Sequence, residues 1–217
     1  MRLTHEQLFL IEKALNEKCN FSSFDDVRTE LTDHIASEIE HILSENECTF
    51  EQAFVKVMTR WNPFILPRSN AWYNNVPYII NILWQKLDWK FQFSAIPATL
   101  LITYLLIVLQ EHNYSVYQFV LPVLLLGVTS TLFLLYRKCT NQVNSTLSIY
   151  ALHKIYTITT LMFIILVLNI FLFKNTIEEY TTIIYWSTVY TSLLITGKAW
   201  VMRKHLKIEN QLLKVIE

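Results

Sequence analysis

The chain has 217 residues, of which 53% are hydrophobic and 17% are charged, and its formal net charge is zero. A soluble domain usually carries about a quarter charged residues, so this composition argues against an ordinary soluble protein, and the zero net charge argues against general nucleic-acid binding. The charges gather in residues 1–60, whereas long stretches after Phe91 carry none. This asymmetry predicts a polar N-terminal head followed by an apolar body.

Residues 1–62 are predicted to form a cytoplasmic domain of three helices. The segments THEQ (from Thr4) and TFEQ (from Thr49) are capping boxes that open the first and third helices, and Ser23 is expected to cap the second. Apolar residues recur at helical spacing, and the expected core is Leu8, Ile11, Leu15, Phe24, Val27, Leu31, Ile35, Ile39, Ile42, Phe50, Ala53, Phe54, Val57 and Trp61. A core of this size gives only marginal stability by itself, so we expect contacts with the membrane, with loops or with a partner to stabilise the head.

A His–Glu–His trio on the second predicted helix raises the question of a metal site. His34, Glu38 and His41 lie at i, i+4 and i+7, so they share a face and could hold a divalent metal ion. A zinc helix of the HExxH type places its histidines at i and i+4, whereas two turns separate these by about 10 Å. We therefore favour a surface histidine bonded to Asp33 or Glu38, and we predict no metal, no cofactor and no catalytic residue.

The same helix carries a resemblance to a known family. The motif DHIAS (Asp33 to Ser37) lies within FDDVRTELTDHIASEIEHIL and precedes TFEQAFVKVMTRW. Roughly over residues 5–62, the chain resembles the small helical domains named for a His-Ala-Ala-Ser (HAAS) motif and the related permease-prefix domains, with Ile35 in place of the first Ala. The resemblance implies a cytoplasmic unit ahead of transmembrane helices in bacterial inner-membrane proteins, associated with PadR-type regulators. It implies a regulatory or interaction role, with Asp33, His34, Ser37 and Glu38 as candidates for an interaction surface.

Residues 63–90 are predicted to form a linker and an interfacial helix. Aromatic residues with a polar edge concentrate in and beside this segment, as is typical of the headgroup level; they are Trp61, Trp72, Tyr73, Tyr78, Trp84 and Trp89. Pro77 can open a helix, in which Ile80, Leu83, Trp84 and Leu87 share one face. We favour an amphipathic helix on the inner leaflet over a plain linker or an early start to the first membrane span.

Four charge-free stretches then predict a bundle of four transmembrane helices, at 91–110, 115–136, 155–173 and 180–197. The fourth is the weakest, because it is rich in Thr, Ser and Tyr. Ten Lys and Arg residues lie on one side of this topology and one on the other, which places both termini and the basic tail 198–217 in the cytoplasm. The three cysteines fall on that side without metal-ligand spacing, and we interpret them as small apolar side chains.

The predicted spans contain polar residues but no Asp, Glu, Lys, Arg or His. This argues against proton-coupled transport and against an intramembrane enzyme. A polar stripe follows the fourth span, and one amide lies inside the third; the residues are Thr181, Tyr185, Thr188, Ser192, Thr196 and Asn169. The stripe either joins helices through hydrogen bonds or lines a path for a solute, and we favour packing.

The fold class predicted from the sequence is therefore all-α: a polytopic membrane protein with a three-helix head, an interfacial helix and a four-helix bundle. The favoured function is a non-enzymatic inner-membrane protein whose head binds another protein in a sensing, regulatory or scaffolding role. Its expected partners are membrane lipid and a protein, and a homo-oligomer stays open. The alternative is a small transporter or channel, or an accessory subunit of a permease; a third hypothesis is an enzyme that uses His34, Glu38 and His41.

Overall fold

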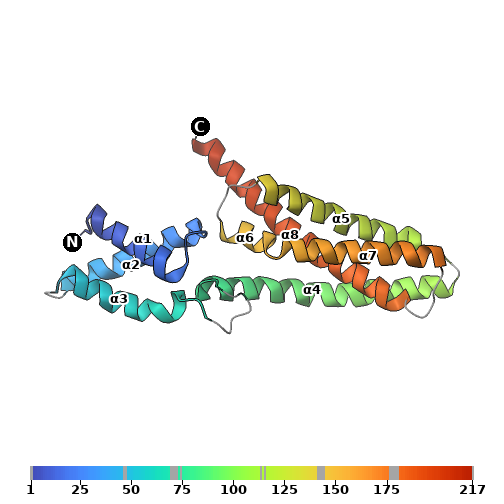
Figure 1. The fold of residues 1–217 in the computed structure, drawn as a ribbon, viewed down its shortest axis with the longest axis horizontal. Coiled ribbons are helices and arrows are strands. Elements are labelled where there is room, and N and C mark those ends of the chain that lie inside the picture. Colours follow the sequence, from blue (N-terminus) through green and yellow to red (C-terminus); the bar gives the residue numbers. More distant parts are fainter. Residues whose placement is uncertain are drawn as a thin grey trace. The chain divides into compact units, whose positions relative to one another are not determined.

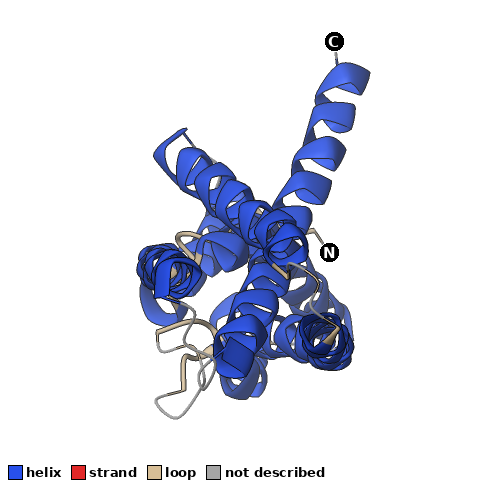
Figure 2. Cartoon of the chain, turned by 90° about the vertical axis from the view of Figure 1, so that its right-hand side faces the viewer, coloured by secondary structure: helices blue, strands red, loops and turns tan. Residues whose placement is uncertain are grey.

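The computed structural model describes residues 2–45, 48–68, 73, 75–112, 114, 116–140, 145–175 and 181–216, without the side chains of residues 117, 172–175, 181 and 207–216. Every regular element in these ranges is an α helix, so the predicted all-α class is confirmed there (Figures 1 and 2). The chain divides into two compact units. Unit 1 is Met1–Leu87 with Val143–Thr146, and unit 2 is Asp88–Gln142 with Leu147–Glu217.

Unit 1 begins with three helices, α1 (His5–Cys19), α2 (Asp25–Glu45) and α3 (Phe50–Ile65). The capping boxes that open α1 and α3 are both confirmed. The hydroxyl groups of Thr4 and Thr49 accept hydrogen bonds from the backbone N–H three residues on. The side-chain oxygens of Gln7 and Gln52 in turn accept hydrogen bonds from the backbone N–H groups of Thr4 and Thr49. The prediction that Ser23 caps α2 is wrong, because α2 begins at Asp25 and Ser23 lies in the turn before it.

The core of unit 1 contains most of the predicted stripe residues. Those that are buried as expected are Ile11, Leu15, Phe24, Leu31, Ile35, Ile39, Ala53 and Val57, whereas Leu8, Val27, Ile42, Phe50, Phe54 and Trp61 are only partly buried. Residues outside the predicted stripes complete the core. Tyr73, Ile80 and Trp84 are all buried, and the Trp84 ring makes edge-to-face contacts with Phe24 and Tyr73.

Helix α4 (Tyr78–Glu111) corrects the prediction of a separate interfacial helix. Residues 78–90 and the predicted first span form one continuous helix, so the early start to the span is the arrangement observed. Of the predicted apolar face, Ile80 and Trp84 are buried in the protein core, Leu87 is partly buried and Leu83 is exposed, so the pattern marks in part a contact with protein. Unit 1 accordingly extends to Leu87 instead of ending at residue 62. Trp89 is exposed and stacks on Phe93, and Trp72 lies outside the described residues.

Unit 2 contains the rest of α4 together with α5 (Tyr117–Thr140), α6 (Thr146–Leu152, from its second residue), α7 (Ile155–Asn175) and α8 (Thr181–Ile216). Helix α5 makes its most extensive contact with α8, and α7 packs against both. Two apolar clusters fill this bundle. One is centred on Leu134, Ile155 and Met202, and the other joins Leu106 of α4 to Val120 and Val189.

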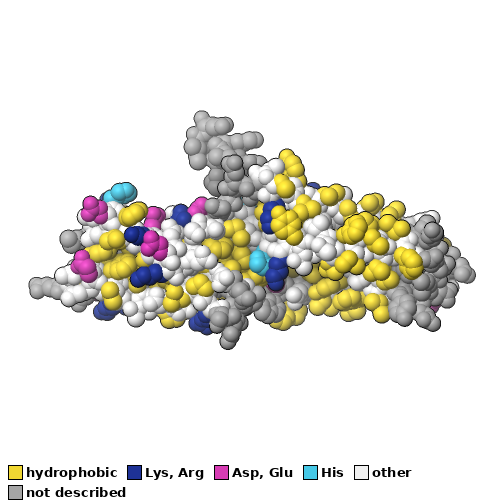
Figure 3. Space-filling view, in the orientation of Figure 1, with side chains coloured by type: hydrophobic (Ala, Val, Ile, Leu, Met, Phe, Trp, Pro, Cys, Tyr) yellow, Lys and Arg dark blue, Asp and Glu magenta, His cyan; other side chains and the backbone are white. Residues whose placement is uncertain are grey.

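Three helical segments in the described part of the chain are long and apolar enough to cross a membrane: Tyr78–Glu111 in α4, Gln118–Thr140 in α5, and Thr146–Phe171, which takes in α6 and most of α7. They match the first three predicted spans and indicate a multi-pass membrane protein. Hydrophobic side chains cover much of the visible face of unit 2, whereas charged ones gather over unit 1 (Figure 3). The predicted fourth span is not among these helices, because the Thr, Ser and Tyr residues of α8 lower its hydropathy.

Candidate functional site

The predicted His–Glu–His trio does not converge on one point. The Nε2 atom of His34 lies 3.9 Å from Glu30 Oε1, and the Nδ1 atom of His41 lies 3.1 Å from Glu45 Oε2. Glu38 points to α3, where its carboxylate accepts hydrogen bonds from Arg60 and, at 2.8 Å, from Trp61 Nε1. Each histidine is therefore paired one turn along its own helix instead of with Asp33 or Glu38. Within the described ranges, no group of three His, Cys, Asp or Glu side chains could hold a metal ion.

Two neighbouring hollows lie beside the predicted interaction residues. A polar hollow of about 520 Å³ is lined by Ser37, Glu38, His41, Ile42, Glu45, Lys56 and Arg60. An apolar hollow of about 340 Å³ is lined by Glu38, Arg60, Trp61, Phe64 and Ile79. The Glu38–Arg60 ion pair borders both, so we call their combined lining the α2–α3 surface. Of the other candidates, Asp33 and His34 are exposed on α2.

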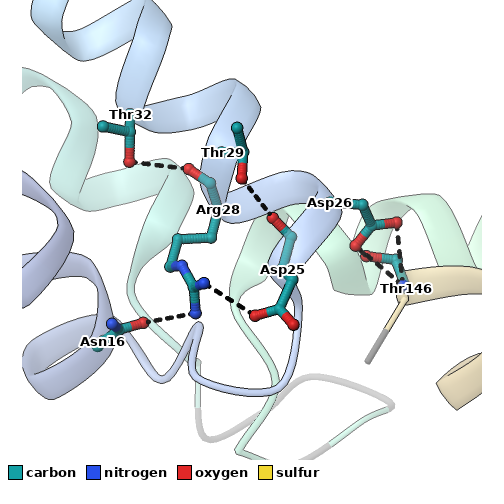
Figure 4. Close-up of polar contacts among 7 residues, drawn as sticks. All are labelled: Asn16, Asp25, Asp26, Arg28, Thr29, Thr32 and Thr146. Atoms are coloured by element: carbon teal, nitrogen blue, oxygen red, sulfur yellow. Dashed lines mark hydrogen bonds and ion pairs between the residues drawn. The ribbon is translucent and has the colours of Figure 1, made fainter. Parts of the chain in front are cut away.

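A second polar site joins α2 to the start of α6 (Figure 4). Both carboxylate oxygens of Asp26 accept a hydrogen bond from the backbone N–H of Thr146 at 3.0 Å, and Oδ1 also accepts one from the Thr146 hydroxyl group at 2.8 Å. The indole Nε1 of Trp84 donates to the Thr146 carbonyl oxygen at 3.2 Å. Asp26 thus satisfies a free N–H at the N-terminus of α6, as a capping residue would, from 120 residues away.

The neighbouring acid, Asp25, has a local role (Figure 4). Its Oδ1 atom lies 2.9 Å from the guanidinium group of Arg28, which also donates to the Asn16 side chain at 3.4 Å. The sequence alone indicated only that both acids suit the N-terminus of a helix. It held no signal for the contact between Asp26 and Thr146, because no local pattern marks a partner so distant in the chain.

We expect Asp26→Ala to destabilise the start of α6 by about 0.5–2 kcal/mol, the usual loss for a removed helix cap. Amide hydrogen exchange in α6 of the full chain should become faster. Asp25→Ala is the matched control, because it removes a neighbouring carboxylate whose ion pair, at i, i+3 with the partly buried Arg28, contributes about 0.5 kcal/mol. Unchanged exchange in α6 after Asp26→Ala would show that the carboxylate does not hold Thr146.

The polar stripe of α8 faces the interior of the bundle. Thr188 and Ser192 are 0% exposed, and Asn169 of α7 donates from Nδ2 to Thr188 Oγ1 at 2.9 Å. Tyr185 is also buried, and the Thr196 hydroxyl group lies 3.4 Å from that of Ser130 in α5. The side chain of the remaining stripe residue, Thr181, lies outside the described part.

Close helix packing occurs at the same level of the bundle. A Cβ atom added to Gly127 of α5 would lie 2.5 Å from the hydroxyl oxygen of Ser192 and 2.8 Å from Met162 Cε. A glycine at this place lets α5 and α8 approach each other, as small residues do between membrane helices. The geometry therefore favours packing over a path for a solute.

The three cysteines differ in their surroundings. Cys19 is buried in unit 1, and this burial raises the pKa of its thiol, so it fits the interpretation as a small apolar side chain. Cys48 is partly buried and Cys139 is exposed, so that interpretation does not describe them.

The chain matches no family model, no curated protein and no solved structure among known proteins. Its class therefore rests on its own fold, which is that of an all-α multi-pass membrane protein with shorter helices at the N-terminus. The resemblance of residues 5–62 to the His-Ala-Ala-Ser domains stays a prediction.

Proposed function

We propose that this chain is a non-enzymatic regulatory or scaffolding protein of the bacterial inner membrane, whose unit 1 binds a partner protein in the cytoplasm. The α2–α3 surface carries the proposal. It combines an apolar hollow with a polar one across the Glu38–Arg60 pair, and such a combination suits an amphipathic segment of another protein. Its lining includes Ser37 and Glu38, two of the residues that the family resemblance marked for interaction.

The cytoplasmic location of both termini requires α8 to cross the membrane. Three of the residues that lower its hydropathy are buried against other helices, namely Tyr185, Thr188 and Ser192. Ile183 and Trp186 are exposed. A helix in this arrangement presents mainly apolar side chains to lipid, although its mean hydropathy is low. The predicted excess of Lys and Arg on one side supports the same orientation.

The path of the chain supports a regulatory role. It passes between the two units at three places, after Leu87, Gln142 and Thr146. At the third place Asp26 and Trp84 of unit 1 bind the first residue of α6. A partner that shifts α2 would therefore alter the cap of a helix that continues into the membrane unit. This is a physical link between binding and the membrane helices.

Photo-crosslinking in cells tests the proposed surface in the full-length protein. A photoreactive amino acid at Ser37 should form an adduct with a second protein, whereas the same group at Lys13 of α1, also exposed, should not. The Phe64→Asp substitution should abolish the Ser37 adduct, since it places a charge in the apolar hollow at a side chain that is 54% exposed. Phe9→Asp is the matched control, at an exposed phenylalanine of α1.

The comparison of adduct formation between the Phe64→Asp and Phe9→Asp variants decides whether the partner binds the α2–α3 surface. Loss of the adduct in Phe64→Asp but not in Phe9→Asp assigns the partner to the α2–α3 surface. Equal adducts from Ser37 and Lys13, or an adduct that survives Phe64→Asp, would contradict the proposal.

A further inference from the structure

A group of basic side chains in unit 2 lies at the end of α5, just before α7 and midway along α8. Lys138 is in the last turn of α5, Lys154 directly precedes α7, and Lys198 follows Gly197 in α8. The Lys138 ammonium group contacts the ring of Tyr156, two residues after Lys154, and the Lys198 ammonium group contacts the ring of Tyr150, three residues before His153, so these side chains lie in one region of unit 2. We call Lys138, His153, Lys154 and Lys198 the basic cluster.

The inner part of the basic cluster is held by contacts within the bundle. The Lys198 ammonium group is 5.1 Å from the centroid of the Tyr150 ring, and Lys198 is half-buried. Tyr150 is fully buried and donates a hydrogen bond from its hydroxyl group to Asp88 Oδ1 at 2.7 Å. The ammonium group of Lys198 is therefore positioned before any ligand binds.

Positive charge exceeds negative charge at this place. Among the described side chains, Asp88 reaches the cluster through its hydrogen bond with Tyr150, whose ring Lys198 contacts, and this one carboxylate stands against three lysines. Lys138 and Lys154 are exposed, and neither forms an ion pair with a carboxylate in the described part of the chain. Neighbouring ammonium groups repel one another, and a bound anion would relieve that repulsion.

Exposed aromatic side chains beside the cluster indicate which anion is available. The Lys138 ammonium group is 4.2 Å from the centroid of the Tyr156 ring, and that of Lys204 is 5.5 Å from the Trp200 ring. Tyr156 and Trp200 are both exposed. Exposed Tyr and Trp at the ends of membrane helices mark the headgroup level, where the anions are lipid phosphates.

We propose that the basic cluster binds the phosphate group of an anionic phospholipid in the cytoplasmic leaflet. Lys138 and Lys154 contact the phosphate oxygens, and Lys198 adds positive charge from inside the bundle. Free phosphate offers the same chemistry, so the test has to separate the two sources. This site is independent of the α2–α3 surface, and either one can fail without the other.

The test measures lipid affinity of the full-length protein in neutral detergent by native mass spectrometry. Phosphatidylglycerol should bind more tightly than phosphatidylcholine with the same acyl chains. The double substitution Lys138→Gln and Lys154→Gln should weaken phosphatidylglycerol binding about thirtyfold, the factor that corresponds to about 1 kcal/mol for each lysine near the surface. Lys13→Gln with Lys56→Gln is the matched control, because it removes the same charge from exposed lysines of unit 1.

The proposal is supported if only the substitutions in the basic cluster weaken phosphatidylglycerol binding. It is overturned if the cluster variant binds phosphatidylglycerol as the unchanged protein does, or if both lipids bind equally. Displacement of phosphatidylglycerol by millimolar inorganic phosphate would assign the site to free phosphate and would likewise overturn the lipid assignment.

Discussion

Trp84→Ala is expected to lower the free energy of unfolding of unit 1 by about 3–5 kcal/mol, the usual range for removing a large aromatic side chain from a core. Trp84 is 1% exposed, and its ring packs against Phe24 and Tyr73. The substitution also removes the hydrogen bond to the Thr146 carbonyl oxygen, which contributes about 1 kcal/mol. Most small domains are stable by only about 5–15 kcal/mol, so much of unit 1 should open.

Trp89→Ala is the control for this prediction, because Trp89 lies five residues further along α4 and is 50% exposed. Its removal should cost less than about 1.5 kcal/mol through the lost stacking on Phe93, and because both residues belong to unit 2 the protection of the α1–α3 amides should not change. Hydrogen exchange of the α1–α3 amides in detergent measures both variants. Equal protection in the two variants would mean that Trp84 is not a core residue and would favour the interfacial interpretation.

The three head helices could be predicted because their signals are local. A capping box occupies four consecutive residues, and the stripe through Ile35 and Ile39 recurs within one helix. Both kinds of pattern therefore gave the right helices, and most of the expected core residues are buried. The turn before α2 has no such box, which is why the expected cap at Ser23 was misplaced.

The role of residues 78–87 could not be read from the pattern. A helical face with Ile80 and Trp84 looks the same whether it meets lipid or a protein core, since both are apolar solvents for a side chain. Only the tertiary contact with Phe24 distinguishes the two cases. The cap that Asp26 provides for Thr146 could not be predicted for the same reason, because it depends on two segments that only folding brings together.

The predicted fourth span shows a limit of mean hydropathy as a criterion for membrane helices. Hydropathy averages over all sides of a helix, so it counts Thr188 and Ser192 as unfavourable although they are buried. By length and composition alone α8 is therefore not a candidate span, yet it packs along α5 in the bundle. We propose that it crosses the membrane, and this crossing determines on which side the C-terminus lies.

Cysteine labelling in spheroplasts tests that crossing most directly. Thr182→Cys and Arg203→Cys place exposed thiols near the two ends of the predicted crossing, each in a chain whose three native cysteines are alanine. A maleimide that cannot cross membranes should label Thr182→Cys in intact spheroplasts. It should label Arg203→Cys only after the membrane is permeabilised. Labelling of both positions in intact spheroplasts would contradict the account, since α8 would then lie wholly outside the cytoplasm.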